Sequence, residues 1–317
     1  MSENYFLWPK SRYLRGGFRG LKKGTTSDIE LLLKQRYSSG VPVIVSSARV
    51  GIVLALMAQK LTRPDYVGIF PFASHCVIES VGRVATPIPA ELSQHDNISL
   101  IYHQWGYIQQ RTSLNTRIIE DAVDSFCHPG SELFPLNGMY EIWSLPKLIG
   151  SLGGGVVWCR DEQSAEDIKA LRDNNKLNTQ PRWLLKLLAS YWPRFESLWF
   201  SAESAGGPLP KWATGDILYG LESWDKIEHA RRERIQIVQS LLPEWLELPD
   251  SRLPSVIPIE VSEEKAKLLI EKGFSAGYRT FEKFNEDQNS ELVRLFPLYV
   301  HQDIPCELLE SSRKILQ

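Results

Sequence analysis

The fold class is indicated most clearly by the stretch Pro42-Val-Ile-Val-Ser-Ser-Ala-Arg-Val-Gly-Ile-Val-Leu-Ala-Leu-Met57. It begins with four apolar residues, mostly β-branched and without polar alternation, which is typical of a strand buried on both faces. Ser46 and Ser47 are good N-cap residues, and the following run over 48–61 is apolar on nearly every side. The stretch therefore predicts a buried strand over 42–46 that leads directly into a buried helix over 48–61.

The same alternation of short apolar runs and amphipathic runs continues along the chain. Further strands are predicted at 67–71, 99–103, 117–121, 139–144 and 155–159, with helices at 74–83 and 161–173. This α/β pattern predicts a mostly parallel sheet flanked by helices on both faces. Ligands bind beyond the carboxyl ends of the strands in such sheets. Four polar residues fall at these ends: Ser47, His103, Asp121 and Ser144.

The last third of the sequence has a different pattern. Its segments are an aromatic-rich helical part (183–200), a Gly- and Pro-rich stretch (205–210), a long charged helix (223–242), a strand (255–261) and two helices (263–272 and 306–316). We expect a large domain over residues 1–222, starting with an N-terminal arm over 1–40, and a smaller C-terminal α+β domain over 223–317.

The composition is that of a globular protein with an apolar core, since 43% of the residues are hydrophobic. The 36 basic and 38 acidic residues nearly cancel, which gives no support for nucleic-acid binding. The basic stretch over 10–23 is best interpreted as a solvated face or a subunit-interface arm.

The sequence offers no pattern typical of membrane insertion, secretion or metal binding. The longest apolar run, 50–57, is far shorter than the roughly 20 residues that a membrane span needs. The N-terminus lacks the pattern of a signal peptide. Four scattered cysteines argue against a zinc site or a disulfide framework. We therefore expect a cytoplasmic protein without a membrane or metal partner.

Two residues near the predicted strand ends carry reactive groups. Lys147 stands in Trp143-Ser-Leu-Pro-Lys-Leu-Ile-Gly150, and its apolar neighbours are expected to desolvate the amine, which lowers a lysine pKa. Asp121 ends an apolar run, where a carboxylate is either a structural cap or a functional charge. Beside Lys147 we favour the functional interpretation.

The junction at Ser47, Ala48 and Arg49 can present backbone N–H groups to an anion, although the same geometry serves a bare N-cap. His75 opens the helix at 74–83 and could stack on an aromatic ring, but a lone histidine is more often structural. A lysine, a carboxylate and an anion-binding turn together meet the demands of pyridoxal phosphate (PLP). Its aldehyde needs a lysine, its ring nitrogen a carboxylate and its phosphate N–H donors.

The order of these features resembles the DegT/DnrJ/EryC1/StrS family of PLP-dependent sugar aminotransferases, which have the aspartate-aminotransferase fold. The resemblance runs from about residue 41 to the C-terminus and is strongest over 44–173. The segments that carry it are Ser47-Ala-Arg-Val-Gly-Ile52, Phe70-Pro-Phe-Ala-Ser-His75, Tyr102-His-Gln-Trp-Gly106, Ile119-Glu-Asp-Ala-Val-Asp124, Ser144-Leu-Pro-Lys147 with Gly154 and Gly155, and the helix from Leu221 to Arg232.

The resemblance implies an aminotransferase that moves an amino group from glutamate or glutamine to a keto sugar, which is nucleotide-linked in most relatives. Lys147 would form the Schiff base with PLP, and Asp121 would keep the ring nitrogen protonated. A homodimer is implied, because such sites are usually completed across the subunit interface. The residues implied to bind the cofactor are Ser47, Ala48, Arg49, His75, Asp121, Asp124, Ser144 and Lys147.

The chain also departs from the family pattern. Ala48 replaces a glycine of the phosphate turn, and Asp124 replaces a Gln or His near the cofactor's phenolic oxygen. The family's Gly-x-Asn-Tyr-Arg-Met loop has no clear counterpart, and an aromatic-rich insertion covers 183–213 instead. Two alternatives stay open: a PLP-dependent dehydratase or lyase of the same family, and a catalytically degenerate member that is not an enzyme.

Overall fold

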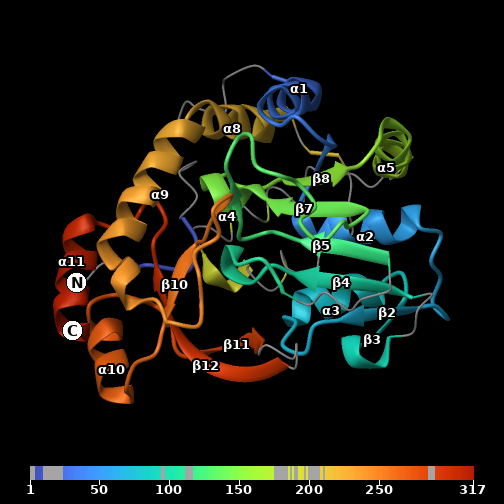
Figure 1. Cartoon of the computed structure of the whole chain (residues 1–317). Helices are drawn as coiled ribbons and strands as arrows, with labels where there is room; N and C mark the ends of the chain where they lie inside the picture. The colour runs from blue at the N-terminus through green and yellow to red at the C-terminus, as the bar shows by residue number, and fades with distance from the viewer. Residues whose placement is uncertain are drawn as a thin grey trace.

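A seven-stranded sheet forms the centre of the protein (Figure 1). The computed structural model describes residues 4–9, 24–93, 97–110, 117–174, 185, 188, 192–195, 198, 208–209, 211–284 and 290–317. Across the sheet the strands are β1 (Val41–Val45), β8 (Gly155–Cys159), β7 (Tyr140–Ser144), β5 (Arg117–Asp121), β4 (Ile98–Tyr102), β2 (Tyr66–Ile69) and β3 (Thr86–Pro89).

The sheet is mostly parallel, as the sequence predicts. Strands β7, β5, β4, β2 and β3 pair in parallel, whereas β8 is antiparallel to both of its neighbours. Because β8 runs against both β1 and β7, β1 has the same direction as β7. The carboxyl ends of β1, β4, β5 and β7 therefore meet at one edge. The four polar residues expected at strand ends lie at this edge.

Helices cover both faces of the sheet (Figure 1). Alternate residues of β1 face opposite sides: Val43 and Val45 join the apolar cluster under α2 (Ala48–Ala58) and α5 (Glu162–Asn174). Ile44 joins the cluster under α1 (Thr26–Arg36) and α8 (Lys211–Glu222). The continuous apolar run of β1 is thus explained by burial on both faces.

Helix α1 was not anticipated, because its residues fall in the segment expected to be an arm. It begins at a capping box in which Thr25 and Asp28 bond each other's backbone N–H groups. Its buried residues Ile29 and Leu33 pack on the sheet, and Glu30 accepts a hydrogen bond from the backbone N–H of Ile44 at 2.9 Å.

The C-terminal part forms a second, three-stranded sheet in the order β10 (Val256–Ile259), β12 (Ser290–Tyr299) and β11 (Arg279–Phe284). Long α9 (Trp224–Val238) leads toward it, and α10 (Glu263–Glu271) and α11 (Cys306–Leu316) lie beside it (Figure 1). A short pair, β6 (Phe126–Cys127) with β9 (Arg252–Leu253), joins the two parts of the chain. The division at residues 222 and 223 stays a prediction.

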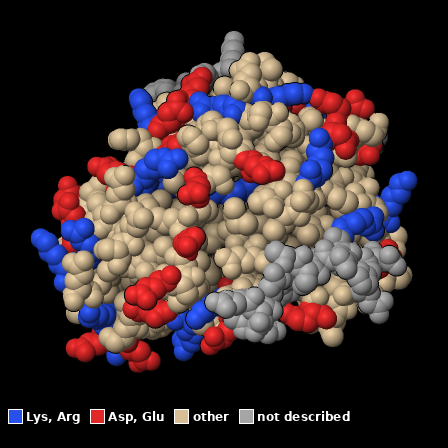
Figure 2. Space-filling model, viewed as in Figure 1, with Lys and Arg blue, Asp and Glu red and all other residues tan. Residues whose placement is uncertain are grey.

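Two sequence features fall largely or wholly outside the described residues: the basic stretch over 10–23 and the aromatic-rich segment over 183–213. In the part of the chain that the structure describes, no helix has the length and apolar character that crossing a membrane requires. Figure 2 shows that acidic and basic side chains are interspersed on the face drawn there.

Candidate active site

Lys147 lies one turn beyond the carboxyl end of β7, on the short helix α4 (Leu145–Ile149). Pro146 occupies the first turn, where its missing N–H costs nothing, and Gly150 ends the helix in the left-handed region at φ 68°. The Lys147 side chain is 27% exposed, and its Nζ lies 3.1 Å from Oδ1 of Asp124. The ring of Trp8 lies over the same nitrogen, with its centroid 5.0 Å away.

The electrostatic setting of Lys147 differs from the expectation. Burial favours a lower pKa, but the carboxylates of Asp124 and Asp121 outweigh burial and raise the pKa of Lys147 above its ordinary value. The prediction of a lowered pKa is therefore wrong for the cofactor-free protein. It rested on the apolar sequence neighbours of the lysine, whereas both carboxylates come from β5 and the turn after it.

Asp121 is the last residue of β5 and is only 2% exposed. Burial raises the pKa of Asp121 to about 7, with Lys147 opposing and Asp124 adding to the rise. Its Oδ1 accepts a hydrogen bond from the backbone N–H of Val123 at 3.2 Å. A carboxylate in this state gains from a nearby cation, and a protonated ring nitrogen of PLP would provide one. The residue fits the partner role.

Asp124 is as deeply buried as Asp121 and is paired on both oxygens. In addition to Lys147, it accepts a hydrogen bond from the hydroxyl of Tyr102 at Oδ2. Tyr102 is the residue opposite Asp121 in the pairing of β4 with β5, and its ring packs 5.1 Å from that of Phe70. An anion at this position needs such partners. Tyr102 was not among the predicted site residues, although its place at a strand end was a signal.

The N-terminus of α2 has the form of an anion site. The side chain of Ser47 caps the helix by accepting from the backbone N–H of Val50 at 3.3 Å. Ala48 is not among the residues with positive φ, so an alanine is tolerated where the related family has glycine. Gly155 of β8 passes directly behind the turn: a Cβ there would lie 2.6 Å from the backbone nitrogen of Ala48.

The remaining predicted residues lie around this edge. Arg49 is half-buried in the first turn of α2, and burial lowers its pKa, an effect that Cys76 and Glu79 of α3 (His75–Gly82) oppose. His75 is exposed at the start of α3, and Ser144 is buried at the N-cap of α4. The structure brings Lys147, Asp121 and Asp124 together; the roles of the others stay predictions.

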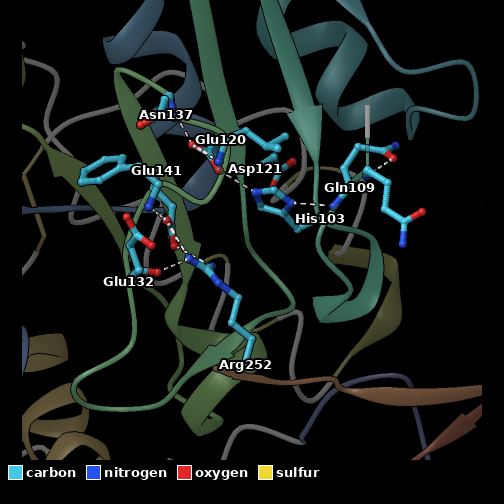
Figure 3. A network of polar contacts seen from close by, with 12 residues as sticks. His103, Gln109, Glu120, Asp121, Glu132, Asn137, Glu141 and Arg252 are labelled. Atoms are coloured by element: carbon cyan, nitrogen blue, oxygen red, sulfur yellow. Dashed lines mark hydrogen bonds and ion pairs between the residues drawn. The ribbon is translucent and has the colours of Figure 1, made fainter. Parts of the chain in front are cut away.

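His103 belongs to a network of polar contacts with Gln109 and Glu120 (Figure 3). Its Nδ1 accepts from the backbone N–H of Gln109 at 3.1 Å, so Nε2 carries the proton and donates to Glu120 at 2.7 Å. Glu120 also accepts from the backbone N–H of Gly138 at 2.6 Å. Since neighbouring residues of a strand point to opposite faces, Glu120 points away from the side of Asp121. His103 therefore secures the strand end and does not face Lys147.

A fully buried ion pair connects β7 with β9 (Figure 3). Arg252 binds Glu141 with both terminal nitrogens, at 2.8 and 2.9 Å, and neither side chain is exposed. The backbone N–H of Phe134 and the indole of Trp143 also donate to Glu141. Burial raises the pKa of Glu141, but Arg252 and these donors outweigh it and hold the pKa below its ordinary value. The pair ties β7 to the C-terminal part of the chain.

Comparison with known proteins agrees with this geometry. A family model described as "Putative PLP-dependent aminotransferase" matches residues 29–304. A search of curated proteins gave no match.

Three solved structures show the same fold. The Brucella abortus DegT DnrJ EryC1 StrS aminotransferase is 14% identical, with 96% of each chain covered and a TM-score of 0.63. DesI, determined in the presence of its TDP-sugar product, is 15% identical, with 100% of this chain and 92% of that chain covered and a TM-score of 0.65. Helicobacter pylori PseC, an aminotransferase involved in the biosynthesis of pseudoaminic acid, is 12% identical, with 99% and 98% covered and a TM-score of 0.62.

The family model covers most of the chain, and the expected lysine and carboxylates converge at the carboxyl edge of the sheet. This chain belongs to the family of PLP-dependent aminotransferases.

Proposed function

We propose that this protein moves an amino group from glutamate or glutamine to a keto sugar, in nucleotide-linked form, with PLP covalently attached to Lys147. The observation that carries the proposal is the convergence of the Lys147 amine with the carboxylates of Asp121 and Asp124. The sugar is supported by the fold relatives, because DesI was determined with a TDP-sugar product and PseC is involved in pseudoaminic acid biosynthesis.

Different residues would bind the phosphate, the ring nitrogen and the aldehyde of PLP. The N–H groups at the start of α2, with Ser47 and Arg49, would hold the phosphate, where the positive end of the helix dipole favours an anion. Asp121 would accept the hydrogen bond of the protonated ring nitrogen. Lys147 would supply the amine for the aldehyde. When bound, PLP draws electrons away from the reacting carbon of the substrate.

The side chains then have defined proton roles. Asp121, as an ionised carboxylate beside a ring cation, would hold the proton on the ring nitrogen. Lys147 would be the acid–base group that moves a proton between the α-carbon of the amino donor and C4′ of the cofactor. The buried position of both carboxylates strengthens these interactions, because few water molecules screen them.

The test is a half-reaction with one amino donor at a time. PLP-loaded protein is mixed with glutamate or with glutamine, and the absorption spectrum and the released keto acid are followed. The proposal predicts conversion of the cofactor to its amine form and, after a TDP-linked 4-keto sugar is added, an aminated sugar with regeneration of PLP.

Other outcomes point to the alternatives. Loss of a hydroxyl from the sugar without gain of nitrogen would support a dehydratase instead. Absence of any spectral change with either donor would contradict the proposed donors.

We also propose that the active protein is a homodimer, as the family resemblance implies. Sedimentation analysis would test this, and a monomer that retains full turnover would contradict it.

A further inference from the structure

Asp124 connects two side chains through its two oxygens. Oδ1 lies 3.1 Å from Nζ of Lys147, and Oδ2 accepts the hydrogen bond of the Tyr102 hydroxyl. The carboxylate is 2% exposed, so water competes little for either contact. Rotation of the carboxylate would break one of the two contacts. The direction of the Lys147 amine is therefore fixed through Asp124, and that of Asp124 through Tyr102.

The charged groups around this amine come from several elements. Asp121 ends β5, Asp124 follows it, and Cys76 of α3 adds a weaker attraction when ionised. The neutral ring of Trp8 covers the amine from the N-terminal segment. Fully buried Arg231 of α9 also attracts the carboxylate of Asp124. The surroundings of Lys147 thus favour its protonated form, against the effect of burial.

The hydroxyl of Tyr102 has a separate role in this arrangement. Tyr102 lies on β4, its ring packs beside those of Phe70 and Phe72, and its hydroxyl also accepts from the backbone N–H of Trp105 at 3.4 Å. A ring held in this way cannot follow a moving carboxylate. Tyr102 is therefore suited to fix Asp124 and has no contact of its own with the lysine amine among the described interactions.

We propose that Asp124, fixed by Tyr102, keeps the Lys147 amine protonated and aimed in the cofactor-free protein, so that the amine becomes reactive only as the pH rises. The inference deepens the proposed function, since it concerns the lysine assigned to PLP. A neutral Gln or His, as the related family has at this position, would supply no charge of this kind. Asp124 contacts the reacting nitrogen, whereas Tyr102 is a positioning residue that acts through Asp124.

The test measures the amine without PLP. Cofactor-free protein is treated with trace acetic anhydride over a range of pH, and acetylation of Lys147 is quantified by mass spectrometry. In Asp124→Asn the midpoint of reactivity should fall by about 1 to 2 pH units, the usual effect of losing a close opposite charge. Tyr102→Phe should shift it in the same direction by a smaller amount.

A matched control is Glu162→Gln, which removes the carboxylate partner of exposed Lys34. It should leave the midpoint of Lys147 unchanged. An unchanged midpoint in Asp124→Asn would overturn the proposal. If that variant fails to fold, as judged by circular dichroism, the result for Tyr102→Phe decides, and an unchanged midpoint there overturns the proposal equally. The proposed function would fail if PLP-loaded protein carried no PLP on Lys147. Because the acetylation assay contains no PLP, its result does not depend on that outcome.

Discussion

Asp121→Asn removes a carboxylate whose ionised form is destabilised by burial in the folded, cofactor-free protein. The pKa of Asp121 is about 7 in the folded protein, against an ordinary value of 3.8. The folded state therefore binds the proton more tightly than the unfolded state, and ionisation of Asp121 opposes folding. This penalty is absent below about pH 4, grows as the pH rises toward 7 and is constant above it.

The magnitude follows from the difference between the two pKa values. The raised pKa of Asp121 should lower the free energy of unfolding by about 2 kcal/mol at pH 5, where folding requires the carboxylate to take up a proton, and by about 4 kcal/mol at pH 8. Asparagine has the same shape and does not ionise, and Lys147 keeps Asp124 as its partner. The variant should therefore be more stable than the parent, and the gain should roughly double over this range.

The assay is urea unfolding of cofactor-free protein, followed by tryptophan fluorescence at several pH values between 5 and 8. Asp225→Asn is the matched control, since Asp225 is 81% exposed and its pair with Arg36 contributes less than about 1 kcal/mol. A variant that is less stable than the parent, or a gain that does not change with pH, would show that the pKa of Asp121 is not raised in the folded protein.

Three further substitutions test the surroundings of the site. Gly155→Ala should weaken PLP binding about tenfold, because the added Cβ would collide with the backbone at the start of α2. Gly277→Ala is the control, since its Cβ would meet no atom within contact distance, and it should leave the Kd measured by PLP titration unchanged. Arg252→Met should lower the free energy of unfolding in urea by about 3–5 kcal/mol, because it leaves the Glu141 carboxylate buried without its cation; a loss below 1 kcal/mol would contradict this. Trp8→Ala should speed acetylation of the lysine amine beneath its ring about two- to fivefold, and an unchanged rate would show that the ring contact has no influence.

Much of the large sheet could be predicted from local sequence pattern. The strands β5 and β8 and the helix α11 have the predicted bounds, and β1 is shifted by only one residue. These segments are short apolar runs or amphipathic runs that end at polar or turn residues. The order of apolar and polar residues within each segment predicts which of them are buried. The proximity of Lys147 and Asp121 was expected because both lie at the carboxyl ends of predicted strands, and the parallel pairing of β5 with β7 places these ends side by side.

Other elements depend on contacts that local pattern does not contain. In β12 the first five residues are partly or fully exposed and the last five are buried, so no single alternation runs through the strand. Helix α1 has few apolar residues besides three consecutive leucines, and it is held by packing on β1 and by its capping box. These features arise from the rest of the fold.

The surroundings of Lys147 could not be predicted from local sequence either. The carboxylates that raise the pKa of Lys147 are 23 and more residues away in sequence, and Trp8 reaches it from the N-terminal segment. That segment is held by the backbone of Gly273 and Ser275 and by His301, which bonds the carbonyl of Phe6 at 2.8 Å. Only the folded chain brings these groups together.

The position of covalently bound PLP tests the proposed role of Lys147 most directly. Protein loaded with PLP is reduced with borohydride, digested and analysed by mass spectrometry, with Lys147→Arg as the control. We expect the reduced cofactor on the peptide that contains Lys147, and no labelled peptide from the control. Attachment to a different lysine, or equal labelling of the control, would show that the Lys147 amine does not hold the cofactor.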